Sequence, residues 1–196
     1  MEAHSRTDNS TEPLHVFEGQ IRESYGRVVY SHKTHEKCAD ILLNRLSFTK
    51  KVQIVLSALT TGGFVSTLLG TGLFSLIVGT ILSALLLALN LYTRDQDLSE
   101  LASKHRGTAN DIWLVREKYL SIITDLAVGE KPLDALQRER DALAVELHSV
   151  YSTAPSTNSE AYEMAQEAIK NNEEMSFSEE ELDVILPPRL RRDRSV

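Results

Sequence analysis

Three residues in one short stretch carry side chains that bind metal ions or act as nucleophiles: His32, His35 and Cys38. A spacing of three brings neighbours together on one side of a helix, and imidazole and thiolate groups are preferred zinc ligands. The pattern lacks a fourth ligand and matches no established metal-binding motif. We therefore expect solvated or interface residues here, with no metal and no cofactor.

The sequence also lacks the usual signatures of catalysis. It has no glycine-rich phosphate loop after a predicted strand, no nucleophile elbow and no HExxH pair. The acidic run EEMSFSEEEL (173–182) is better explained by helix capping and solubility than by paired catalytic carboxylates. His105 falls on the apolar seam of a predicted helix, where we expect a packed residue. The sequence predicts no enzyme.

The dominant element around these residues is a stretch without charge. The 42 residues from Val52 to Thr93 contain no Asp, Glu, Lys, Arg or His. A single membrane span needs about 20 apolar residues, whereas one helix of this length would measure roughly 63 Å. We predict two spans, at about 52–69 and 73–92, joined by a turn at Gly70-Thr71-Gly72. The predicted fold class is an all-α membrane protein with a two-helix transmembrane hairpin.

Basic residues flank the hairpin on both sides. Lys50 and Lys51 precede the first span, and Arg94 follows the second. Because cytoplasmic flanks are enriched in Lys and Arg, both termini are predicted to be cytoplasmic. No signal peptide is recognisable at the N-terminus, and the single cysteine fits a reducing compartment.

Small residues recur at four-residue spacing in both spans, and in lipid such faces let helices pack closely. One interpretation is that the faces join the two spans to each other. The other is that one face does so while the second meets a neighbouring subunit, so that hydroxyl side chains of the first span line a pore. No ionisable group lies within the spans, which argues against an ion-coupled transporter. The small residues are Gly62, Ser66, Gly70, Ser75, Gly79 and Ser83; the candidate pore-lining residues are Ser57, Thr60, Thr61 and Thr67.

The rest of the chain is predicted to be cytoplasmic and mostly helical, forming a helical stalk or bundle. We expect a helix break near 46–49, a stop at Gly129, and capping boxes that begin at Thr157 and Ser178. Residues 159–183 hold nine acidic residues and one Lys, so neither nucleic acid nor a phosphate ligand is expected there. The predicted segments are a disordered N-terminus (1–13), an amphipathic helix (14–51), the hairpin (52–93), stalk helices (94–151), short C-terminal helices (152–188) and a basic tail (189–196).

This layout resembles the SLATT family of bacterial two-transmembrane effectors, which are associated with nucleotide-signalling and other conflict systems. The resemblance covers roughly 14–191 and includes YSTAPSTNSEAYEMAQEAIK (151–170) and FSEEELDVILPPRLR (177–191). It implies an antiphage effector that oligomerises in the bacterial inner membrane, permeabilises it, and causes cell death or arrest. It also implies a genomically linked companion, such as a nucleotidyltransferase or a reverse transcriptase. The alternative is a membrane-anchored helical scaffold that recruits a cytoplasmic partner.

Overall fold

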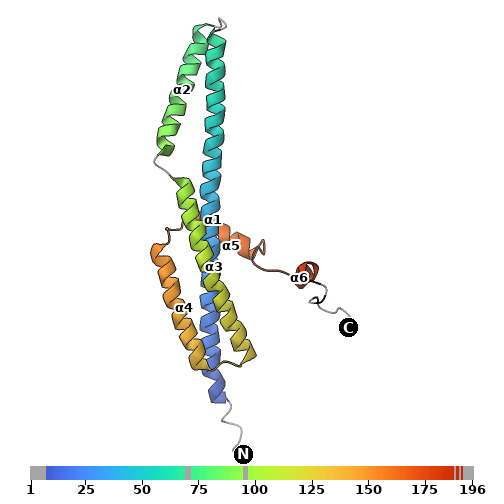
Figure 1. Ribbon diagram of the computed structural model, residues 1–196. Coiled ribbons are helices and arrows are strands. Elements are labelled where there is room, and N and C mark those ends of the chain that lie inside the picture. Colours follow the sequence, from blue (N-terminus) through green and yellow to red (C-terminus); the bar gives the residue numbers. More distant parts are fainter. Residues whose placement is uncertain (1–7, 69–71, 95–96, 188, 190, 192–196) are drawn as a thin grey trace, which may run out of the picture.

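The computed structural model describes residues 8–68, 72–94, 97–187, 189 and 191, except for the side chains of 8–13, 67, 68 and 94. The described residues form helices and connecting segments, without strands (Figure 1). This agrees with the predicted all-α class. A long helix forms the axis of the molecule, and the other helices contact it or extend from the bundle around it.

Helix α1 runs without interruption from Asp8 to Leu68, a length of 61 residues. At 1.5 Å per residue it spans about 90 Å, so it serves both the helical bundle and the first half of the hairpin. The predicted break near 46–49 is therefore wrong. That stretch contains polar residues but neither Gly nor Pro, so nothing in its backbone chemistry ends a helix. The helix also begins at Asp8, inside the segment 1–13 that was predicted to be disordered.

The bundle core lies where α1 packs against α3 (Leu98–Val128) and α4 (Leu133–Thr153). Its largest fully buried side chains are aliphatic, and they recur at the three- and four-residue steps of a helix face. Burying such a side chain contributes about 1.5–3 kcal/mol. The cluster therefore holds α3 and α4 on α1. Its members include Ile21, Val28, Ile112, Val115, Ile122, Leu136 and Leu143.

The connection between α3 and α4 follows local rules. Gly129 ends α3 in the left-handed conformation, with φ of 75°, and its N–H donates to the Asp125 carbonyl. Glycine adopts this conformation without steric cost. Pro132 is the N-cap of α4. The predicted helix stop at Gly129 is confirmed.

Helix α5 (Ser159–Lys170) crosses α1 through a face of small residues. Ala161, Ala165 and Ala168 are each at most 1% exposed, and their spacing places them on one stripe. Its N-cap is Asn158, whose side chain accepts from the Ala161 N–H at 2.8 Å. The predicted cap at Thr157 is wrong, because the neighbouring Asn158 caps this helix instead.

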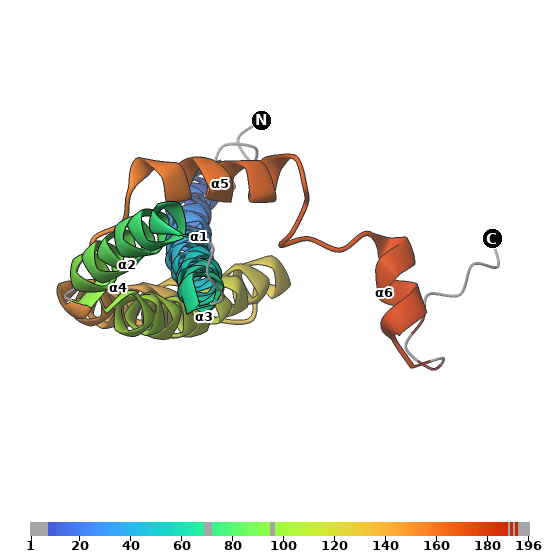
Figure 2. The ribbon, with the colours of Figure 1, turned by 90° about the horizontal axis from the view of Figure 1, so that it is seen from above.

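Helix α6 (Glu179–Ile185) follows at the end of an extended segment. Its predicted capping box is confirmed: the Ser178 side chain accepts from the Glu181 N–H, and the Glu181 carboxylate accepts from the Ser178 N–H. The helix buries none of its residues and lies to one side of the bundle (Figures 1 and 2).

Candidate functional site

The candidate site is the hairpin formed by the end of α1 and by α2 (Leu73–Arg94). The two helices lie close together where glycine faces glycine. A Cβ atom built on Gly63 would lie 3.6 Å from the Gly79 Cα and 3.9 Å from the Ser75 carbonyl oxygen. A methyl group therefore just fits at residue 63, whereas a larger side chain would push the helices apart.

Polar side chains pair along the same interface. The hydroxyl oxygens of Ser66 and Ser75 are 3.4 Å apart. Near the opposite end, the Gln53 side-chain amide donates to the Asn90 side-chain oxygen at 2.9 Å. In an apolar surrounding, such pairs satisfy polar groups that would otherwise be costly to bury. The inner face of the hairpin thus combines glycine and hydrogen-bonded polar side chains with partly covered apolar residues such as Leu56, Leu82 and Leu86.

The small residues predicted to form packing faces do not all lie on the same side of the hairpin. The structure brings Ser66, Ser75 and Gly79 to the inner face, whereas Gly62 and Ser83 are exposed. Open space surrounds the position of a Cβ on Gly62. Gly70 lies outside the described residues. Gly63 was not among the predicted small-residue positions, yet it lies against α2. Only the rotation of α1 relative to α2 distinguishes it from Gly62.

The candidate pore-lining residues are also divided. Ser57 and Thr61 are exposed and lie one turn apart on α1, while Thr60 is partly covered. Both threonine hydroxyls donate to backbone carbonyls four residues earlier, Thr60 to Leu56 and Thr61 to Ser57. The side chain of Thr67 lies outside the described part. Ser57 and Thr61 therefore form a short hydroxyl stripe on the outside of the hairpin.

Large apolar side chains cover the exterior of α2. Phe74 is 78% exposed and Leu73 is 72% exposed, whereas soluble monomers rarely expose large contiguous apolar patches. Among the described residues, one stretch, which starts at Leu73, is long and apolar enough to cross a membrane, with a mean hydropathy of 2.2. The first predicted span ends at residue 69, outside the described residues. Lys50 and Lys51 are exposed at the base of the hairpin, and the side chain of Arg94 is not described.

Below the hairpin, His35 and His105 meet at the interface between α1 and α3. Both residues are 3% exposed, and their Nδ1 atoms are 3.0 Å apart. Burial lowers both pKa values; the pKa of His35 falls to about 4, because the neighbouring His105 and His32 further disfavour its charged form. Two neutral rings then share one hydrogen bond, in which one Nδ1 donates and the other accepts.

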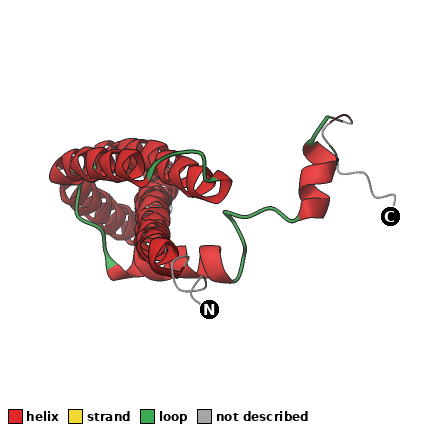
Figure 3. Cartoon of the chain, turned by 90° about the horizontal axis from the view of Figure 1, so that it is seen from below, coloured by secondary structure: helices red, strands yellow, loops and turns green. Residues whose placement is uncertain are grey.

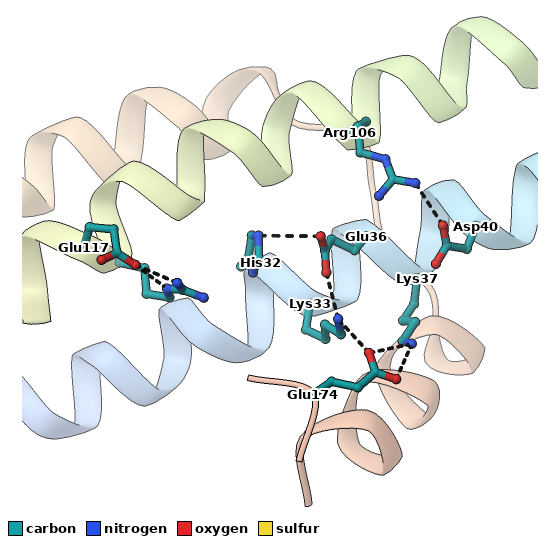
Figure 4. A network of polar contacts seen from close by, with 9 residues as sticks. His32, Lys33, Glu36, Lys37, Asp40, Arg106, Glu117 and Glu174 are labelled. Carbon is teal, nitrogen blue, oxygen red and sulfur yellow. Dashed lines mark hydrogen bonds and ion pairs between the residues drawn. The ribbon is translucent and has the colours of Figure 1, made fainter. Parts of the chain in front are cut away.

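A network of ion pairs runs along α1 near His32 (Figure 4). The Lys33 ammonium contacts Glu36 at 2.9 Å and Glu174 at 2.8 Å, and Lys37 contacts Glu174 at 3.2 Å. Burial disfavours the charged form of Lys33, but its bonds to Glu174 and Glu36 outweigh that effect and raise its pKa. Glu173 has a φ of 51°, an uncommon value for a residue with a side chain. This turn directs Glu174 to both lysines.

The three residues first considered as metal ligands have separate surroundings. His32 lies 3.9 Å from Glu36 through Nε2, His35 pairs with His105, and Cys38 is buried in a small cluster with Ile41 and Ala161. In the described part of the chain, no group of three His, Cys, Asp or Glu residues is placed to hold a metal ion. Sequence reasoning missed the His35–His105 contact, because the partner lies 70 residues away.

Comparison with known proteins gives one match. Residues 17–181 match the SMODS and SLOG-associating 2TM effector domain family 4. No curated protein and no solved structure matches the chain. The family match covers most of the sequence and includes the histidine pair, the hairpin and α5. The expected SLATT membership is confirmed: the chain belongs to the SMODS and SLOG-associating 2TM effector domain family 4 and is a membrane-associated effector of conflict systems.

Proposed function

We propose that this protein oligomerises through the exterior of its hairpin and permeabilises the inner membrane, which leads to cell death or arrest. The observation that carries this proposal is the division of the small residues between two faces. Gly63, Ser66, Ser75 and Gly79 serve the hairpin itself. Gly62 is exposed, with open space where a side chain would begin, so it offers a neighbouring helix a close approach.

The proposed pore belongs to an assembly. Two helices enclose too little space for a conduction path, so several hairpins must contribute. The exposed stripe of Ser57 and Thr61 supplies hydroxyl groups, which would line the water-filled path of the pore. We propose that both termini lie in the cytoplasm, with Lys50 and Lys51 at the headgroups. A genomically linked protein supplies the activating signal.

A matched set of leucine variants tests the proposal. Gly62→Leu adds bulk on the exterior of α1 and is expected to abolish oligomers and depolarisation while the hairpin still inserts. Ala88→Leu adds the same bulk at an exposed position of α2 and is the control for insertion. Chemical cross-linking in isolated membranes, together with membrane potential and dye entry after induced expression, gives both readouts. A monomeric wild type, or a Gly62→Leu variant as active as wild type, would refute the proposal.

A second candidate function is a membrane-anchored scaffold. Its support is the C-terminal region, where Phe177 and Val184 are exposed at 66% and 75%. In that case the hairpin acts only as an anchor. Replacing the hairpin with an unrelated one would then preserve function, whereas a pore would lose it.

A further inference from the structure

An open groove of about 600 Å³ lies where α1, the end of α4 and the start of α5 meet. Three tyrosines are among the residues that line it, and the ring centroids of Tyr30 and Tyr162 lie 6.1 Å apart. Tyr151 and Tyr162 are 41% and 46% exposed. Tyrosine anchors both apolar and hydrogen-bonding partners with little loss of side-chain entropy. We call this site the tyrosine groove; its walls include Arg27, Tyr30, Tyr151, Pro155, Ser156 and Tyr162.

The groove offers donors for acidic groups. Arg27 pairs with Glu23 at 2.6 Å, and both side chains are well exposed. Such an exposed pair is weak and exchanges readily. The hydroxyls of Ser156 and of the tyrosines add further donors beside the aromatic rings. A segment that carries apolar anchors next to carboxylates fits this chemistry.

The C-terminal segment of the chain has that composition. We call residues 176–186 the arm; it contains the capped helix α6 with Glu179, Glu180 and Glu181 in its first turn. Its apolar residues Phe177, Val184 and Ile185 are between 66% and 75% exposed. A helix of seven residues is marginal in water without a packing partner, so the arm needs another surface to be stable.

The loop before α5 and the segment that leads to α6 lie at opposite ends of α5 (Figures 2 and 3). The groove includes the loop that leads into α5, while the arm leaves from its far end, after Glu174 is held by Lys33 and Lys37. The arm therefore leads away from the groove of its own chain. Figure 1 shows α6 beside the bundle, near the level of α5.

Anchoring in the membrane determines which groove the arm can reach. Copies anchored by the same hairpin stand side by side at the same height, so an arm that extends sideways meets the next copy. We propose that the arm of one copy docks into the tyrosine groove of a second copy, with α6 carboxylates near Arg27 and apolar residues against the tyrosines. Because the two surfaces differ, the contact is heterologous and repeats head to tail, which gives a ring where the rotation between copies closes and an open filament where it does not. This inference rests on the oligomer of the proposed function and assigns its cytoplasmic contact.

Cysteine cross-linking between two distinguishable copies tests the contact. In a Cys38→Ala background, one tagged chain carries Val184→Cys and a second, differently tagged chain carries Ser156→Cys. Co-expression followed by mild oxidation in membranes is expected to give a disulfide-linked heterodimer, whereas neither chain alone forms one. Val145→Cys replaces Ser156→Cys in the control, because Val145 is 72% exposed on α4 but lies outside the groove.

Charge variants show whether the groove recognises the arm. Arg27→Glu is expected to lower the cross-linked fraction roughly fivefold, and Glu180→Arg on the arm chain is expected to restore most of it. A heterodimer that is insensitive to both substitutions would overturn the assignment of Arg27 to the arm. Circular dichroism of each variant checks that the bundle remains folded.

A parallel cross-link separates this inference from the proposed function. Gly62→Cys reports association of hairpins in the same membranes. If Gly62→Cys cross-links while Val184→Cys and Ser156→Cys do not, the arm contact is wrong and the oligomer stands. If neither pair cross-links, the oligomer itself is refuted. A disulfide that forms only within a chain carrying both Val184→Cys and Ser156→Cys would also overturn the contact between copies.

Discussion

The Nδ1 atoms of His35 and His105 face each other at 3.0 Å across the interface between α1 and α3. Both residues are almost completely buried, so the pair is a polar contact inside the helical bundle. A hydrogen bond between two imidazoles requires that one Nδ1 carry a proton and the other not. The interface therefore depends on both rings remaining neutral.

We expect the bundle to lose stability as the pH falls. The pKa of His35 is about 4 in the folded chain, below its ordinary value of 6.5, because burial and the neighbouring His105 and His32 disfavour its charge. Between these values the unfolded chain binds a proton that the folded chain does not. Stability is therefore complete above pH 6.5 and falls toward pH 4, by on the order of 3 kcal/mol.

Thermal unfolding of the detergent-solubilised protein at several pH values measures this loss. His35→Gln is expected to flatten the dependence on pH, whereas His148→Gln, at an exposed position of α4, should leave it unchanged. An unchanged slope in His35→Gln would contradict the assignment of the pH dependence to the buried pair.

The contact of Glu174 with Lys33 and Lys37 is expected to hold the segment after α5 on α1. The pKa of Glu174 is lowered by its hydrogen bonds to the two lysines, and the Lys33 side chain is only 12% exposed. Glu174→Gln removes the charge and should destabilise this local contact by about 1 kcal/mol. Faster amide exchange over residues 168–176 is the expected signal.

The matched variant for Glu174→Gln is Glu160→Gln. Glu160 pairs with Arg45 at 3.3 Å, but both side chains are about 60% exposed. Solvent screens such a pair, so its loss should leave amide exchange almost unchanged. Equal effects of the two substitutions would indicate that burial of Lys33 does not strengthen the Glu174 contact.

Two alanine substitutions at glycine are expected to act in opposite directions. Gly129→Ala forces a side chain into φ of 75° and should cost about 1 kcal/mol. Gly107→Ala lies within α3, where a Cβ meets open space, and should stabilise the helix by about 0.5–1 kcal/mol. Chemical denaturation of the solubilised protein measures both. If the two variants shift stability in the same direction, backbone conformation does not govern these positions.

Short-range sequence patterns correctly predicted helix ends that depend on one residue or on close neighbours. The capping box at Ser178 and Glu181 joins residues three apart, and the stop at Gly129 depends on one residue's conformation. The cap of α5 was placed one residue too early because Thr157 and Asn158 both have suitable side chains. The predicted break near 46–49 was wrong. A change from charged to apolar side chains changes the surroundings that a helix prefers, but it does not end the helix.

The sequence by itself determined the helical class, the uncharged hairpin segment and the family, since these depend on composition and on order along the chain. Only the tertiary structure decided which of two adjacent glycines faces α2, and that His35 meets His105. Such facts depend on the rotational phase of packed helices. Neighbouring residues on a helix differ by about 100° in direction, so a choice between Gly62 and Gly63 requires the position of the partner helix.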